Sequence, residues 1–177
     1  IDRNFKIKDL NRSELPVYDV KYNQKKPYEK ISSKSNNYIF KCFNIILKLA
    51  KQKKIIGFIN CPVSKESLFK NNHQGVTEFL SQKLKAKDNG CMLIFNKTLS
   101  VSPITTHIAL NKVFKNISEK KIIQKVKSIN RFYIKFLNRK PKFAILGLNP
   151  HNFTRSKKSK EYLIIKNSIK KLTKLNI

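Results

Sequence analysis

Apolar residues recur every three or four positions along three long segments of the chain, at residues 38–51, 118–137 and 160–175. This spacing places the apolar side chains on one face of a helix, so each segment is predicted to form an amphipathic helix. Ser118, followed by Glu119, is suited to cap the second helix. Two shorter helices are predicted, one after Pro62 and one that opens at Thr77.

Short apolar runs between these helices are typical of buried strands. They lie at residues 17–22, 55–60, 91–95, 99–105 and 142–148. The runs at 91–95 and 99–105 are separated by three residues, which favours an antiparallel hairpin. Strands that alternate with helices predict an α/β layered fold. We expect residues 1–36 to be an irregular N-terminal segment that continues from a missing part, and residues 37–177 to be a central α/β domain.

Composition narrows the class of protein. The chain has 177 residues, of which 40% are hydrophobic. Its apolar runs are far shorter than the roughly 18 residues of a membrane-spanning helix, and its N-terminal stretch lacks the apolar core of a signal peptide. Its three cysteines are widely spaced, which argues against a disulfide framework or a zinc finger. We therefore expect a cytoplasmic protein with no membrane partner. The first residue is not Met, which suggests a fragment or a processed chain.

The net charge of +29 has two interpretations. Such a surface attracts nucleic acid by charge alone. However, almost all of the charge comes from scattered lysines, whereas arginine is the better reader of bases and phosphates. Lys, Asn and Ile are all abundant in the chain, which is the composition expected when the coding sequence is rich in A and T. Compositional drift is therefore the favoured interpretation, and nucleic acid is an unlikely partner.

Two of the three histidines, His107 and His151, directly follow strand-like runs. Because ligands bind outside the carboxyl ends of strands in open α/β sheets, these imidazoles could converge on a divalent metal. From the residues alone, ordinary polar turn residues are the favoured interpretation, since a metal normally needs three or more protein ligands. The third histidine, His73, lies in an Asn-rich stretch that looks exposed. No dinucleotide fingerprint, P-loop or nucleophile elbow is present in the sequence.

Four ordered segments carry a family resemblance: INCPVSKESL, GVTEFL, ITTHIAL and ILGLNPHN. Their order and spacing resemble the 4-hydroxythreonine-4-phosphate dehydrogenases of pyridoxal phosphate (vitamin B6) biosynthesis, whose patterns are GPVxK, GHTE, ATTH and GLNPH. The resemblance runs from about residue 17 to the end and covers about the middle half of the family's usual length. It implies the α/β fold of the isocitrate and isopropylmalate dehydrogenases, of which this chain would form the central portion.

The resemblance also implies roles for individual residues. His107 and His151 match two of the family's three metal-binding histidines; the third belongs to a later YHDQG segment that this sequence lacks. The metal is expected to be Zn, Mg, Co or Mn. The substrate-binding His-Thr pair of the family matches Val76 and Thr77, so the histidine is replaced here. Lys65 matches the lysine of GPVxK. Catalytic residues and the residues that contact NAD are not identified.

One further departure follows the last motif, where the family's glycine-rich HAGEGG is replaced by HNFTRSKKSKE. Glu161 aligns with a later glutamate of the family.

The implied reaction is NAD-dependent oxidation and decarboxylation of 4-phosphooxy-L-threonine to 3-amino-2-oxopropyl phosphate, by a homodimer with a shared active site. This chain alone is expected to be incomplete for that reaction. Two alternatives stay open. One is a related dehydrogenase of a phosphorylated threonate or erythronate, and the other is a catalytically decayed basic protein that binds nucleic acid.

Overall fold

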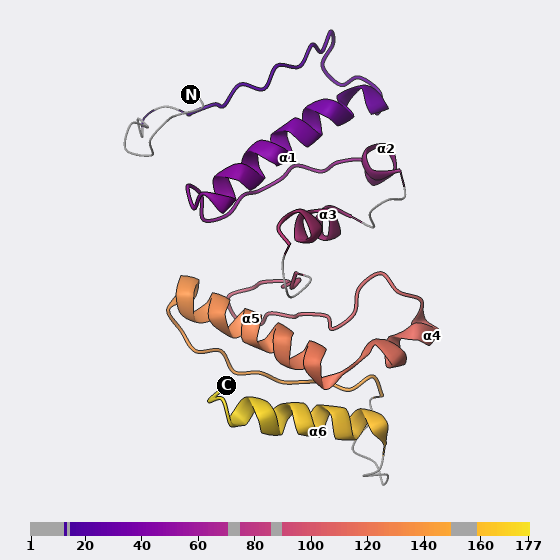
Figure 1. Ribbon diagram of the computed structural model, residues 1–177, viewed down its shortest axis with the longest axis vertical. Coiled ribbons are helices and arrows are strands. Elements are labelled where there is room, and N and C mark those ends of the chain that lie inside the picture. The colour runs from indigo at the N-terminus through magenta and orange to yellow at the C-terminus, as the bar shows by residue number, and fades with distance from the viewer. Residues whose placement is uncertain (1–12, 14, 71–74, 86–89, 150–158) are drawn as a thin grey trace. The chain divides into compact units, whose positions relative to one another are not determined.

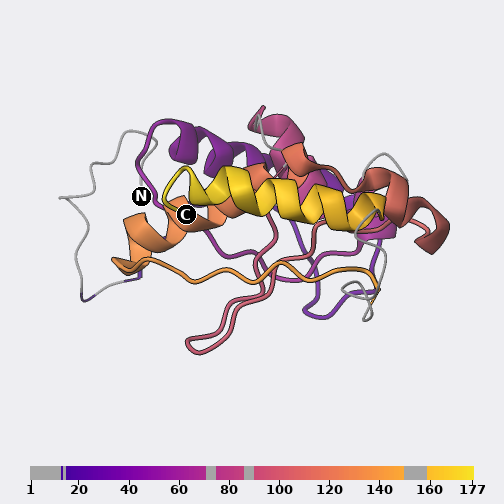
Figure 2. The same ribbon diagram turned by 90° about the horizontal axis from the view of Figure 1, so that it is seen from below.

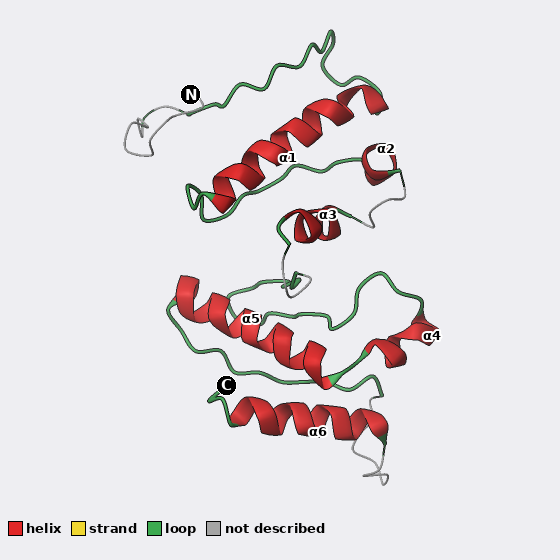
Figure 3. Cartoon of the chain, in the orientation of Figure 1, coloured by secondary structure: helices red, strands yellow, loops and turns green. Residues whose placement is uncertain are grey.

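The computed structural model describes residue 13 and residues 15–70, 75–85, 90–149 and 159–177, which form helices joined by extended segments (Figure 3). The chain divides into two compact units, Ile1–Ala86 and Lys87–Ile177, called here the N-terminal and C-terminal units. The predicted domain 37–177 therefore contains the unit boundary within it.

The N-terminal unit contains a 3-10 turn, η2 (Ser33–Ser35), and the helices α1 (Asn36–Lys51), α2 (Lys65–Phe69) and α3 (Val76–Lys83) (Figure 1). All three α-helices were predicted, and α3 begins one residue earlier than expected. Ser64 caps α2 by accepting a hydrogen bond from the Ser67 backbone N–H at 3.3 Å. Asn36 ties α1 to α2, since its side-chain amide donates to the Ser67 carbonyl oxygen at 2.6 Å.

An aromatic cluster forms the core of this unit. It consists of the buried residues Phe43, Leu68, Phe69 and Phe79. The Phe79 ring lies 5.5 Å from the rings of Phe43 and Phe69, centroid to centroid, in the tilted arrangements that aromatic pairs prefer. The cluster thus joins one side chain or more from each of the three helices, and it packs the end of α2 and the middle of α3 against α1.

The C-terminal unit contains α4 (Leu110–Val113), the 3-10 turn η3 (Phe114–Asn116), α5 (Glu119–Leu137) and α6 (Lys160–Thr173). Helices α5 and α6 were predicted; α4 and η3 were not. Figures 1 and 2 show α5 and α6 lying side by side. Ile122 and Val126 of α5 and Leu172 of α6 are the buried centre, against which Phe143 and Ile145 pack from an extended segment.

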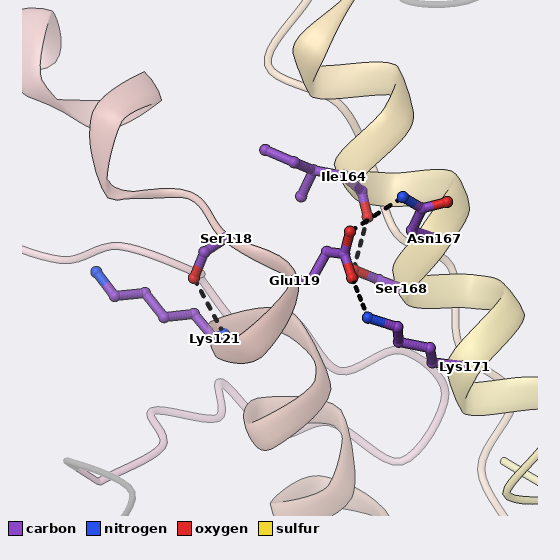
Figure 4. A network of polar contacts seen from close by, with 7 residues as sticks. All are labelled: Ser118, Glu119, Lys121, Ile164, Asn167, Ser168 and Lys171. Carbon is purple, nitrogen blue, oxygen red and sulfur yellow. Dashed lines mark hydrogen bonds and ion pairs between the residues drawn. The ribbon is translucent and has the colours of Figure 1, made fainter.

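Polar contacts also join α5 to α6, as Figure 4 shows. The Glu119 carboxylate accepts a hydrogen bond from Asn167 at 3.0 Å and pairs with the Lys171 ammonium at 2.5 Å. The hydrogen bonds from Lys171 and Asn167 lower the pKa of Glu119 from its ordinary value. Ser118 caps α5 as predicted, because its hydroxyl accepts from the Lys121 backbone N–H at 3.3 Å.

The predicted strands are not formed as paired strands in the part of the chain that the structure describes. Residues 91–101 turn back on themselves in a projecting hairpin (Figure 2), yet only Ile94 and Val101 make an antiparallel bridge, with N···O distances of 2.8 and 2.9 Å. Residues 17–22, 55–60 and 142–148 are assigned to neither helix nor strand. A strand needs a neighbour that pairs its backbone groups, and these runs have none among the described residues. The α/β class stays a prediction.

No helix in the described ranges combines the length and apolar character needed to cross a membrane.

Candidate functional site

The start of α3 carries the two residues that were predicted to bind substrate. The Val76 side chain packs against the aromatic cluster, so it faces the core of the N-terminal unit. Thr77, the next residue, is exposed. A helical step of about 100° per residue accounts for this difference. Position 76 is therefore used for packing, and the Thr77 hydroxyl is the polar group of the pair that solvent or a ligand can reach.

Lys65 lies next to this segment, although nine residues separate it from Gly75 in the sequence. A Cβ atom built on Gly75 would lie 3.8 Å from Lys65 Cε and 3.9 Å from Lys65 Nζ. The same atom would lie 3.0 Å from Glu78 Oε2. The fold thus brings the lysine of the first motif together with the glycine and the glutamate of the second. Gly75 leaves room for both side chains.

His107 occupies an unusual backbone position in the C-terminal unit. Its φ of 55° lies in the left-handed region, which costs free energy for a residue with a Cβ, although histidine tolerates it better than most. The side chain is exposed, whereas Ile104, three residues earlier, packs against the core formed by α5 and α6. The backbone therefore turns sharply at the residue predicted to bind metal, next to an anchored segment. Such strain is frequent at functional sites.

His151, the other predicted metal ligand, and His73 lie outside the described residues, so convergence of His107 with His151 stays a prediction. The motif that contains His151 is described as far as Asn149. Just before that point, the Leu148 backbone N–H donates a hydrogen bond to the Glu161 carboxylate in the first turn of α6. This contact connects described residues on the two sides of residues 150–158.

Within the described ranges, no group of three or more His, Cys, Asp or Glu residues is arranged to hold a metal. His107 by itself does not fit a metal, which normally takes three or more protein ligands. The metal site predicted at His107 includes His151 and a further ligand.

Two features of these candidate residues, one in each unit, were missed by the sequence reasoning. The left-handed backbone at His107 has no sequence signal, because turn residues such as Gly or Asn would normally mark it. The proximity of Lys65 to Gly75 could be predicted only in part from the sequence. Lys65 matches a family motif, but the motif does not indicate which residues the lysine contacts.

Comparisons with known proteins agree with the motifs. A family model described as pyridoxal phosphate biosynthetic protein PdxA matches residues 2–177. The chain is 44% identical over 103 residues to the 4-hydroxythreonine-4-phosphate dehydrogenase of Sulfurihydrogenibium sp. (strain YO3AOP1), a match that covers 56% of this chain and 32% of that protein. It is 26% identical over 124 residues to the D-threonate 4-phosphate dehydrogenase of Salmonella typhimurium, covering 69% of this chain and 38% of the relative.

A solved structure is also similar. The crystal structure of 4-hydroxythreonine-4-phosphate dehydrogenase from Klebsiella pneumoniae matches 84% of this chain and 46% of its own chain, with a TM-score of 0.71 and 21% identity. This likeness concerns the fold. The chain thus spans 32%, 38% and 46% of the length of these three proteins.

Proposed function

The chain belongs to the family of the pyridoxal phosphate biosynthetic protein PdxA, and we propose that it contributes part of the active site of an NAD-dependent 4-hydroxythreonine-4-phosphate dehydrogenase. The observation that carries the proposal is the family match over residues 2–177, which includes all four motifs. The chain covers only 32% of the relative from Sulfurihydrogenibium, so the complete reaction is proposed for an assembly that supplies the rest of the fold. The α/β architecture expected from the sequence is part of the same proposal.

The proposed substrate is 4-phosphooxy-L-threonine. Its hydroxyl-bearing carbon loses a hydride, and the hydroxyl loses its proton, which gives a β-keto acid. Loss of carbon dioxide and uptake of a proton then give 3-amino-2-oxopropyl phosphate. When bound, NAD supplies the hydride acceptor and a divalent metal supplies Lewis-acid stabilisation of the oxyanion. The protein has to hold the substrate, orient it and exclude water.

Thr77 is proposed to bind the substrate through its exposed hydroxyl. His107 and His151 are proposed as two ligands of the metal, completed by a ligand from outside this chain. The exposed ring of His107, on a backbone turn beside an anchored segment, supports this role, because a ligand must be held in one direction. A homodimer and a cytoplasmic location remain predictions.

Metal binding by the chain tests the proposed roles of His107 and His151 directly. Isothermal titration calorimetry with Zn²⁺, Mg²⁺, Co²⁺ and Mn²⁺ is expected to detect binding that disappears in a His107→Ala, His151→Ala double variant. His73→Ala, a matched histidine control, should bind as the original chain does. Binding that persists in the double variant would refute the assignment of these ligands. NAD reduction with 4-phosphooxy-L-threonine is then measured after the remaining segments of the family fold have been supplied.

A second candidate is a D-threonate 4-phosphate dehydrogenase. It is favoured by the relative of that name in Salmonella typhimurium and by Val76, which removes a histidine from the substrate motif. The two substrates differ at C2, where one carries an amine and the other a hydroxyl. Comparing kcat/KM for both compounds in the completed protein separates the two functions.

A further inference from the structure

Lys65 and the start of α3 form a cluster of polar side chains that has no assigned role. Lys65 Nζ and Glu78 Oε2 approach the same side of Gly75, at 3.9 and 3.0 Å from the position of a Cβ there. Thr77, exposed, lies between Gly75 and Glu78 in the sequence. Lys65 is exposed as well, so its ammonium group can contact a ligand beside α3 without first leaving a buried position.

The charges at this place limit what can bind. The Glu78 carboxylate alone would repel an anionic ligand near Thr77 by Coulomb interaction. Lys65 offsets that charge, and its compact ammonium group on a flexible stem is suited to phosphate oxygens. Val76 offers no polar contact, because its side chain packs against the aromatic cluster. Among the described residues of the two motifs, Lys65 is therefore the cation best placed to attract an anion to Thr77.

We propose that Lys65 is a specificity-determining residue that binds a phosphate group beside Thr77. A Cβ atom at position 75 would meet the flexible Glu78 carboxylate at 3.0 Å and would touch Lys65 at ordinary van der Waals distances of 3.8 and 3.9 Å. The identity of the ligand as the substrate's phosphate rests on the proposed function. Phosphate binding at this cluster does not, because it requires neither NAD nor a metal.

The test uses the 177-residue chain, ¹⁵N-labelled and titrated with inorganic phosphate at constant ionic strength. The backbone amide signals of Gly75 and Thr77 report on binding at the cluster. We expect these signals to move and saturate, with an affinity that falls about tenfold in Lys65→Met, since a hydrogen bond to a charged group is lost. Lys65→Arg should retain binding within a few-fold.

Lys51→Met is the matched control, because it removes one positive charge from an exposed lysine at the end of α1. It should leave the affinity at Gly75 and Thr77 unchanged. Equal losses in Lys51→Met and Lys65→Met would overturn the inference, since they would reflect the net charge of +29 alone. Unchanged affinity in Lys65→Met would overturn it as well. Lys65→Gln, with a polar side chain of similar length, repeats the test if the methionine variant does not fold.

Combining the phosphate titration with the dehydrogenase assay distinguishes failure of this inference from failure of the proposed function. Phosphate binding that depends on Lys65, in a completed protein that oxidises neither candidate substrate, would support this inference and count against the proposed function. Oxidation of a substrate with a kcat/KM unaffected by Lys65→Met would support the proposed function and overturn this inference.

Discussion

Replacing Phe79 by alanine is expected to destabilise the N-terminal unit by about 3 to 5 kcal/mol. The Phe79 side chain is only 3% exposed, and its ring lies between 5.5 and 5.7 Å from those of Phe40, Phe43 and Phe69. Truncation removes the buried ring surface and leaves a cavity. It also removes ring contacts, each of which contributes about 0.5 to 1.5 kcal/mol beyond the burial of area.

The position of Phe79 in α3 makes this loss relevant to the candidate site. Within α3, all of whose residues the structure describes, Phe79 is the one buried side chain. The eight-residue helix is too short to be stable in water without tertiary contacts. The contact of Lys65 with the Gly75 segment should therefore be lost together with the packing of Phe79.

Urea unfolding followed by residue-resolved NMR measures this effect. The backbone amide of Leu80 reports on the N-terminal unit, and that of Leu172 reports on the C-terminal unit. Gln82→Ala is the control, because this exposed residue lies on the same helix and its truncation should change stability by no more than about 0.5 kcal/mol. A loss below about 1 kcal/mol at Leu80 in Phe79→Ala would refute the reasoning, since the ring would then not be holding α3.

Three further predictions concern the C-terminal unit. In urea unfolding, the His107→Gly variant should be more stable than the His107→Ala variant by about 1 kcal/mol, because glycine adopts the φ of 55° without strain. Equal stabilities of the two variants would contradict the left-handed backbone at this residue. Hydrogen bonds from Lys171 and Asn167 lower the pKa of Glu119 in the folded state. The ionised Glu119 carboxylate therefore stabilises the folded state at pH values above the ordinary pKa of 4.5, and this stabilisation is lost as the pH falls through the folded pKa. Thermal unfolding of Glu119→Gln should therefore show a weaker loss of stability between pH 5 and pH 3 than the original chain, and parallel pH profiles would argue against this role. Tyr133→Phe should lower the free energy of unfolding by about 1 kcal/mol, since the Tyr133 hydroxyl donates a hydrogen bond to Ser100 Oγ at 2.8 Å in a partly buried position. Measuring Ser100→Ala alone and together with Tyr133→Phe shows whether both losses come from this one hydrogen bond.

Local patterns were sufficient to predict the long helices. Helix α5 begins where Ser118 caps it, and its buried residues Ile122, Val126 and Tyr133 belong to the stripe seen in the sequence. Caps and helical periodicity act within a few residues, so the sequence alone contains them. The strand predictions depended on distant partners. Residues 142–148 have the composition of a buried strand, and Phe143 and Ile145 do pack inward, but pairing requires a neighbouring segment that the described residues do not supply.

The candidate functional residues of the two units show the same division between local and long-range information. The motif residues Lys65, Thr77 and His107 could be identified from the sequence, because residue types in a fixed order identify a family without any knowledge of their positions in space. Tertiary structure decided that Val76 faces the aromatic cluster, that Lys65 reaches Gly75, and that the backbone turns left-handed at His107. The first two features follow from packing between segments distant in sequence, and packing selects one arrangement among several that the local sequence permits.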